Sequence, residues 1–343
     1  MNISRNKRLF PESWNIIMIC IIGSETTKNY GLFTDIEHSH DCKIVYATPP
    51  FLYGTIFCRV IRRARKRVHN TNKIQIPPVW ERSIIKNLGH FEHIIVIDTA
   101  LRWINPDFLN KCKEIKPELL IDCLLLNSTK SWTFSEHRIH STFNSFNWSN
   151  ILTFDPHDAK TNNWIYTGLY YYSKYTLKPP RKQDADLFFA GSCKGQRGKI
   201  LLQLLACFNK NDIDCQFWCP SLNKRHYLSD WFNRAPGLHL MWKRVSYKRI
   251  LQKMMNCNCI LEVLQEGQEG SSLRYFEAVC YNKKLLTTNP DIINYPFYDD
   301  RFMKVFVNES DIDYDWIKKT EHIDYGYNSE FSPIHLLSKL PLE

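Results

Sequence analysis

Short apolar runs recur along this chain, and the segments between them are long enough to form helices. The strongest run is His93–Asp98, in which four consecutive apolar residues are followed by an aspartate. Helices that cover both faces of a parallel sheet leave its strands apolar on both sides, so short uninterrupted apolar runs are typical of such sheets. The pattern therefore predicts an α/β fold with parallel strands.

The other predicted strands have the same composition. They are Ile16–Ile22, Lys43–Ala47, Leu119–Leu126, Asn150–Phe154, Ala185–Ala190, Asp214–Cys219, His239–Met241, Asn258–Leu264 and Lys284–Thr288. Helices are predicted between them at Phe51–Val68, Pro106–Lys116, Gly198–Asn209 and Ser246–Met255. Asp155 followed by Pro156 predicts a further helix start, because aspartate caps helices and proline fits the first helical position.

The length of the chain and one proline-rich segment predict two domains. A chain of 343 residues is long for a single hydrophobic core. The double proline in Lys178–Gln183 can continue neither a helix nor a central strand. Immediately after it the pattern of strands and helices restarts. We therefore predict an N-terminal domain over residues 1–180 and a C-terminal domain over residues 181–343.

The loop between the predicted strands Asn258–Leu264 and Lys284–Thr288 is the main candidate binding site. It lies at the carboxyl end of a strand in a βαβ unit, where open α/β sheets bind ligands. The stretch Gly270, Ser271, Ser272, Leu273 and Arg274 begins the intervening helix. Free backbone N–H groups and the helix dipole would stabilise an anion there, and Arg274 adds a positive charge. We expect this stretch to hold a phosphate.

A second loop opens the predicted C-terminal domain. Gly191 and Ser192 follow a strand, and Lys194 and Arg197 can supply cations. The loop has the spacing of neither a P-loop nor a dinucleotide-binding G-x-G-x-x-G motif. These residues disfavour an ATPase or a dinucleotide-dependent dehydrogenase, while an ordinary strand-to-helix turn with exposed cations stays possible.

The residues around the first loop resemble a known family. Glu269 and Glu277, with seven residues between them, resemble the E-x7-E element of retaining glycosyltransferases of the GT-B architecture. The wider string Gln265–Ala278, followed by Lys283–Asn289, is similar to bacterial lipopolysaccharide-core and capsule biosynthesis proteins, as is the Phe-Asp-x-x-Asp-Ala string at Phe154–Ala159. The resemblance is strong over about residues 185–300 and thin over the first 140.

This resemblance implies two Rossmann-like domains that face each other across a cleft. The C-terminal domain would bind a nucleotide-sugar donor, and the N-terminal domain a bacterial surface glycan or its lipid-linked precursor. By the same resemblance Glu269 approaches the donor sugar, Glu277 contacts the nucleotide ribose, and Arg197 or Lys194 holds the donor diphosphate. Such enzymes generally need no essential bound metal or further cofactor.

Two other classes of function stay open. One is a non-catalytic protein that binds a sugar nucleotide or a glycan on the same fold. The other is a nucleotide-sugar epimerase. Asp98, at the carboxyl end of its strand, is a candidate base or acceptor contact, although an aspartate here is also typical of a turn. A retaining reaction would need no separate base.

The net charge of +10 is partly local. The basic cluster, at the end of a predicted helix, places five cations in six positions: Arg62, Arg63, Arg65, Lys66 and Arg67. Such a cluster is either a solvated helix end or a contact for an anionic membrane surface. No helix-turn-helix, RNA-binding or zinc-finger pattern accompanies it, so we expect no nucleic-acid partner.

Cysteine spacing and hydropathy limit where in the cell we expect this protein to be. The twelve cysteines show no paired spacing of a zinc site, so we expect reduced thiols, many of them buried, and no bound metal. No run approaches the roughly 20 apolar residues that span a membrane. We expect a cytoplasmic protein that can contact the inner face of the cytoplasmic membrane.

Overall fold

The chain forms two compact units. The computed structural model describes residues 19–37, 41–48, 78–129, 132, 137–179, 183–193, 195–220, 235–241, 245–265, 268, 270, 272–337 and 340. The first unit consists of Met1–Leu126 and Trp132–Thr153, and the second of Asn127–Ser131 and Phe154–Glu343. The predicted helix Phe51–Val68 and its basic cluster lie outside the described residues.

The first unit is built on a parallel sheet. Its strands are β1 (Ile19–Ser24), β2 (Cys42–Ala47), β3 (His93–Ile97), β4 (Leu120–Leu125) and β5 (Ile151–Thr153). They pair in parallel in the order β2-β1-β3-β4-β5. The short strand β6 (Ile165–Tyr166) lies in the residues of the second unit. Every residue of β1 and β3 is buried, as the apolar runs predicted.

The helices of the first unit include several that the apolar pattern did not predict. They are α1 (Glu25–Tyr30), α3 (Val79–Lys86), α4 (Pro106–Ile115) and α5 (His137–Asn144), with 3-10 turns η1 (Thr34–Ile36), η2 (Leu88–His90) and η3 (Asp98–Trp103). The predicted α4 begins where Asn105 accepts the backbone N–H of Asp107 and Pro106 takes the first helical position.

The second unit contains another parallel sheet. Its strands are β7 (Ala185–Ala190), β8 (Cys215–Pro220), β9 (Leu238–Met241), β10 (Cys257–Glu262), β11 (Lys284–Thr287) and β12 (Met303–Val305). They pair in parallel in the order β12-β11-β10-β7-β8-β9. Two parallel sheets with helices between their strands confirm the predicted α/β fold.

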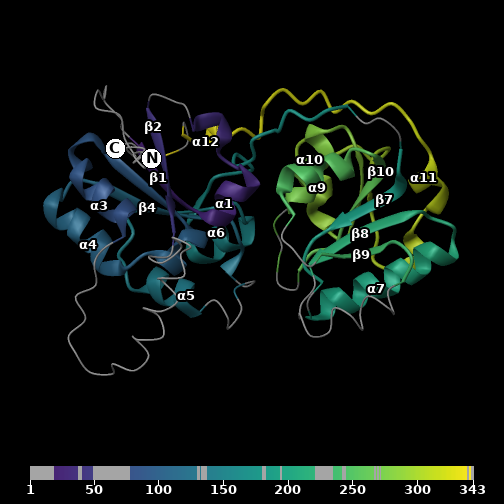
Figure 1. Cartoon of the computed structure of the whole chain (residues 1–343), viewed down its shortest axis with the longest axis horizontal. Helices are drawn as coiled ribbons and strands as arrows, with labels where there is room; N and C mark the ends of the chain where they lie inside the picture. The colour runs from purple at the N-terminus through teal and green to yellow at the C-terminus, as the bar shows by residue number, and fades with distance from the viewer. Residues whose placement is uncertain are drawn as a thin grey trace, which may run out of the picture. The chain divides into compact units, whose positions relative to one another are not determined.

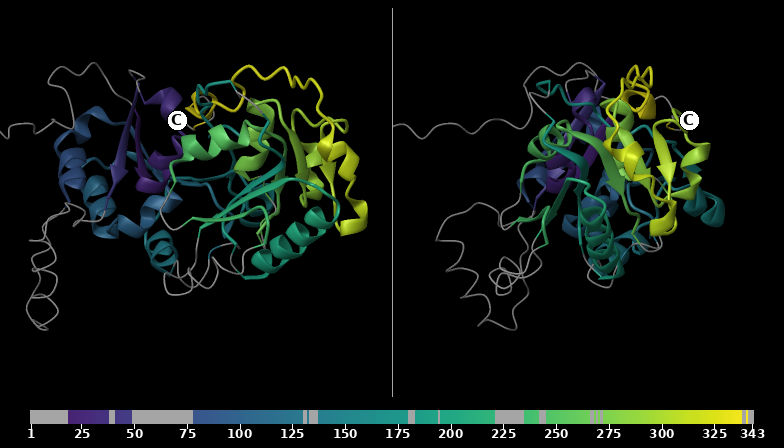
Figure 2. Two further views of the ribbon diagram at one scale, coloured as in Figure 1. Left: turned by 45° about the vertical axis from the view of Figure 1, so that its right-hand side comes forward. Right: turned by 90° about the vertical axis from the view of Figure 1, so that its right-hand side faces the viewer.

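Helices cover both faces of the second sheet. They are α7 (Gly195–Lys210), α9 (Tyr247–Met254), α10 (Leu273–Cys280) and α11 (Tyr314–Lys318), with α6 (Pro156–Asn162), α12 (Ile334–Leu337), η6 (Pro290–Asn294) and η7 (Glu309–Asp311) elsewhere in the unit. Leu187 and Phe189 of β7 pack with Leu205 of α7 and Ile317 of α11 in one core. Figure 1 and Figure 2 show α7 across the sheet from α9 and α10.

The segment that precedes the predicted boundary near residue 180 belongs to the second unit, whose longer part begins at Phe154. The rings of Tyr171 and Tyr172 pack on Phe276 of α10 at centroid distances of 4.9 and 5.5 Å. The backbone N–H of Tyr172 also donates to the carbonyl of Phe331 at 3.0 Å. These contacts join the segment before the prolines to the second unit.

Candidate functional site

The strand order reverses once in the second sheet. The chain runs outward from β7 through β8 to β9 and then returns to the other side of β7, where β10 begins the opposite half. The connections after β7 and β10 leave the sheet in opposite directions at such a point, so their carboxyl ends border a crevice where open α/β sheets bind ligands. Gly191 directly follows β7, and Glu262 ends β10.

Arg197 lies beside this switch point, in the first turn of α7. Its guanidinium carbon is 5.4 Å from the ring centroid of Phe189. A Cβ atom at Gly191 would lie 3.5 Å from the Nη2 atom of Arg197, an ordinary van der Waals contact, so the guanidinium lies directly against the start of this loop. The buried Nε atom of Arg197 has no hydrogen-bond partner within the described part of the chain.

The surroundings of Arg197 destabilise the charged form of its guanidinium. Burial and, secondarily, the positive charge of Arg274 lower its pKa to about 10, while the carboxylate of Glu262 acts in the opposite direction. A pKa near 10 still leaves the guanidinium protonated at neutral pH. A buried donor without a partner carries a free-energy penalty that an anionic ligand would remove.

Glu262 holds the start of α10 against the end of β10. The carboxylate is fully buried and accepts hydrogen bonds from the backbone N–H and the hydroxyl of Ser272, at 3.1 and 2.5 Å. The hydroxyl of Thr287 in β11 donates to it at 2.5 Å. Burial raises the pKa of Glu262, and the bonds from Ser272 and Thr287 oppose that shift.

Sequence reasoning did not single out Glu262. The available signal was one acidic residue directly after the apolar run Cys259–Leu261. A carboxylate at the end of a buried strand needs donors, and this requirement alone could have marked it.

The backbone donors expected to be free at the start of α10 have protein partners. The N–H of Gly270 donates to Oδ2 of Asp155 at 3.3 Å, and the N–H of Ser272 to Glu262. The N–H of Arg274 donates to the hydroxyl of Ser272 at 3.2 Å, which caps the helix. At these three positions the predicted phosphate cradle is thus filled by the protein itself.

Packing accounts for the glycine at position 270. A Cβ atom there would approach the ring of Phe154 to 2.5 Å, which is too close for a side chain. Gly270 therefore permits contact between this loop and the segment before α6. The small residue that suggested phosphate binding is required by this contact.

Arg274 and Glu277 form an ion pair on successive turns of α10. The carboxylate of Glu277 is fully buried and also accepts the hydroxyl of Tyr247 at 2.6 Å. Burial raises the pKa of Glu277, while Arg274 and Tyr247 act to lower it. Glu277 thus positions Arg274 near the switch point, and its contact with a ribose stays a prediction.

The other predicted site residues divide into three groups. Ser192, five residues before Arg197, and Leu273, directly before Arg274, are half-buried at the two loops of the switch point. Glu269, Ser271 and Lys194 lie outside the described residues, so their predicted roles stay predictions. Asp98 belongs to the first unit.

Asp98 follows β3 at the carboxyl edge of the first sheet and is almost fully buried. Its Oδ1 atom accepts the backbone N–H of Thr99 at 2.6 Å, the geometry of a turn aspartate. The hydroxyls of Ser24 and Thr99 lie 2.8 Å apart, and that of Thr27 lies 3.2 Å from both. This hydroxyl cluster borders β1 and β3, between which the strand order of the first sheet reverses.

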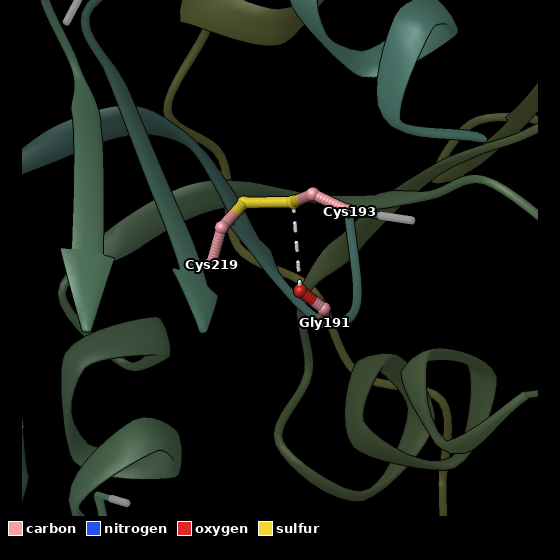
Figure 3. Close-up of a disulfide and its surroundings, with 3 residues drawn as sticks. All are labelled: Gly191, Cys193 and Cys219. Atoms are coloured by element: carbon pink, nitrogen blue, oxygen red, sulfur yellow. Dashed lines mark hydrogen bonds between the residues drawn. A yellow bond between two sulfur atoms is a disulfide. The ribbon is translucent and has the colours of Figure 1, made fainter. Parts of the chain in front are cut away.

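One pair of cysteines departs from the prediction of reduced thiols. Cys193 and Cys219 form a disulfide, which joins the loop after β7 to the end of β8 (Figure 3). The prediction is wrong for this pair, because tertiary packing brings the two side chains together across adjacent strands. Nine other cysteines in the described ranges are free, and eight of them are buried.

No helix in the described ranges is both long and apolar enough to cross a membrane. The same ranges contain no cluster of three or more His, Cys, Asp or Glu side chains that could hold a metal ion.

No protein-family model and no curated protein matches the chain. A UDP-N-acetylglucosamine 2-epimerase from Rickettsia bellii superposes with a TM-score of 0.46 at 10% identity, over 95% of this chain and 93% of the other. The structure of LpCGTa in complex with UDP gives 0.42 at 9% identity, over 95% and 93%. MurG from Acinetobacter baumannii gives 0.36 at 7%, over 94% of each chain. These similarities identify neither a reaction nor a substrate for this chain.

Proposed function

We propose that the second unit binds the diphosphate of a nucleotide-activated sugar at the switch point between β7 and β10, and that the protein transfers the sugar to an acceptor. The observation that carries this proposal is Arg197, a charged side chain whose buried Nε atom has no partner in the described part of the chain. A phosphate oxygen is a strong acceptor for such a donor. The nearby Arg274 adds a second positive charge.

Sugar transfer makes chemical use of this charge. When the bond between the sugar and the nucleotide breaks, negative charge grows on the leaving diphosphate. A fixed guanidinium in a site of low dielectric constant stabilises that charge most in the transition state. Arg197 would thus contact the leaving group, while Glu277 and Glu262 keep Arg274 and the start of α10 in place.

The proposed acceptor rests on the resemblance of the sequence to GT-B glycosyltransferases. We propose a bacterial surface glycan or its lipid-linked precursor as acceptor, with Glu269 near the donor sugar and retention of configuration. The hydroxyl cluster of Ser24, Thr27 and Thr99 offers groups that could bond a sugar hydroxyl, and Asp98 lies next to it. Asp98 is a contact residue in this proposal, since retention requires no separate base.

Calorimetric titration with UDP, GDP, ADP and CDP tests the binding step. Replacing Arg197→Met removes the charge and keeps an unbranched side chain. We expect at least one nucleoside diphosphate to bind the wild-type protein, and the variant to bind it roughly ten- to hundredfold more weakly, the value of a charge-assisted hydrogen bond. Lys199→Met, on an exposed residue of the same helix, is the matched control and should leave the affinity unchanged. Equal affinities of the wild type and Arg197→Met would contradict the role of Arg197.

Turnover tests the transfer step. The nucleotide sugar whose diphosphate binds best is incubated with the protein and candidate glycan acceptors, and the release of nucleoside diphosphate is measured. Release that depends on an acceptor supports the proposal. Binding without turnover would favour a non-catalytic binding protein, and an epimerised sugar as product would favour an epimerase.

A further inference from the structure

The disulfide Cys193–Cys219 lies at the edge of the candidate site. Cys193 is in the loop after β7, two residues beyond Gly191 and four before Arg197, while Cys219 is in β8, which pairs with β7. Their Cα atoms are 6.1 Å apart, and 26 residues separate them in the sequence. Figure 3 shows the bond joining the loop to the strand, with Sγ of Cys193 also 3.6 Å from the carbonyl oxygen of Gly191.

The loop that carries Cys193 folds back onto the first turn of α7. A side chain at Gly198 would overlap the carbonyl oxygen of Cys193, so only glycine allows this approach. Gly198 directly follows Arg197. A covalent tether at Cys193 therefore restricts the first turn of α7 and, with it, the position of the Arg197 guanidinium.

Cys193 is more accessible to a small disulfide than most other cysteines in the described ranges, whereas Cys219 is buried. Cys193 is half-buried, whereas eight of the nine free cysteines in the described ranges are buried. Burial raises the pKa of the Cys257 and Cys280 thiols to about 12, so they form little of the reactive thiolate at neutral pH. Cys207, the remaining one, has its sulfur 3.0 Å from the hydroxyl of Tyr314 in α11 and has no cysteine partner.

We propose that reversible formation of the Cys193–Cys219 disulfide regulates the affinity of this site for the diphosphate. In the bonded state the loop is tethered to β8 and Arg197 is held in place for an anion. In the reduced state the loop is more flexible, so binding carries the entropic cost of ordering the loop. The inference rests on the proposed diphosphate site and adds a redox control to it.

The oxidant is a low-molecular-weight disulfide, R–S–S–R. The thiolate of Cys193 attacks one of its sulfurs, which forms a mixed disulfide and releases one R–S⁻. The thiolate of Cys219 then attacks the Cys193 sulfur, forms the protein disulfide and releases the second R–S⁻. Two protein thiols are oxidised, one small disulfide is reduced to two thiols, and the two protons from the cysteines go to the released thiolates. A dithiol reverses both steps.

Titration of the full chain with inorganic pyrophosphate in two redox states tests the proposal. One sample is treated with oxidised glutathione and the other with dithiothreitol, and alkylation followed by mass spectrometry gives the state of each cysteine. We expect the reduced protein to bind pyrophosphate about tenfold more weakly, in line with the loss of a preorganised loop. Cys193→Ser and Cys219→Ser should bind like the reduced protein under both conditions. Cys207→Ser, on α7 but outside the disulfide, should keep the full redox response.

Hydrogen exchange of residues 191–198 provides a second measurement that needs no ligand. We expect faster exchange in the reduced than in the oxidised protein, and no such difference in Cys193→Ser. Two thiols that stay reduced after oxidised glutathione, or equal exchange and equal affinity in both states, would overturn the proposal. If exchange responds to redox state but neither state binds pyrophosphate, the redox device exists and the proposed diphosphate site fails, which also overturns the regulation of affinity.

Discussion

Four charged side chains meet at the switch point of the second sheet, and their hydrogen bonds are unevenly distributed. Glu277 is bonded by Arg274 and Tyr247, and Glu262 by the neutral donors Ser272 and Thr287. Arg197 has an Nε atom without a partner in the described ranges. Since the two carboxylates already have their donors, Arg197 is the charge in this group that an incoming anion would satisfy best.

A buried glutamate elsewhere yields a prediction about pH. Glu81 in α3 is 5% exposed, and burial raises its pKa from 4.5 to about 7. The pKa in the folded state is then above that in the unfolded state, so the folded protein binds the proton more tightly. Stability is therefore greatest below about pH 4.5 with respect to this group, and it falls as pH rises from there to about 7.

Glu81→Gln removes this titration. We expect the variant to melt at a higher temperature than the wild type at pH 8, where the wild type must bury a charge. At pH 4, where both side chains are neutral, the melting temperatures should coincide. Melting followed by circular dichroism at both pH values checks this. Glu114→Gln, on an exposed residue of α4, is the control, and its melting temperature should equal that of the wild type at both pH values.

At the scale of elements, the junction of β10 and α10 is held by side chains. Glu262 at the end of the strand accepts both donors of Ser272, and the Ser272 hydroxyl in turn accepts the N–H of Arg274. The chain leaves β10 and re-enters a helix at a residue fixed by these bonds. The same bonds explain why this helix start has few donors to offer to a ligand.

Ser272→Ala removes the cap of α10 and one donor to a buried carboxylate. We expect a loss of about 2 kcal/mol in the free energy of unfolding of the second unit, which combines the loss of a cap with a less satisfied carboxylate. Urea unfolding measures it. Ser246 stands at the same position before α9 but makes no capping bond, so Ser246→Ala is a matched control expected to cost much less. Similar losses in the two variants would refute the role assigned to Ser272.

At the scale of the whole molecule, the two units meet in sequence near residue 153, and the aromatic segment that follows belongs to the second unit. Tyr172 is fully buried, stacks on Phe276 at an interplanar angle of 18°, and has its hydroxyl 3.2 Å from that of Tyr247. These contacts join the segment to α9 and α10. Its stability should therefore follow that of the second sheet.

Tyr172→Ala tests this assignment. We expect a loss of roughly 3 kcal/mol, typical of a large buried ring, confined to the second unit. Hydrogen exchange should accelerate in β10 and β11 and stay unchanged in β1 and β3. Phe91→Ala, at a fully buried residue of the first unit, should give the reverse pattern. Acceleration in β1 and β3 after Tyr172→Ala would place the segment with the first unit.

Local patterns in the sequence were enough to predict most strands and several helices. The runs at His93–Ile97 and Ala185–Ala190 form buried strands, and Asp155 caps α6 as expected, with Oδ1 accepting two backbone N–H groups of that helix. Each of these features depends on residues a few positions apart. The short helices α1 and α5 were not predicted, because helices of six and eight residues carry little periodic signal.

Local patterns in the amino-acid sequence are enough to predict the class of fold and to name a candidate site. A parallel sheet requires apolar strands, and open α/β sheets bind ligands at their strand ends, so Arg197 and Ser272 could be named as candidates from the sequence. The partners of the polar groups there depend on contacts between distant parts of the chain. Gly270 meets Asp155, and Cys193 meets Cys219, over separations of 115 and 26 residues. A hydrogen bond or disulfide needs its two groups within a few ångströms, and packing alone settles which distant residues come that close.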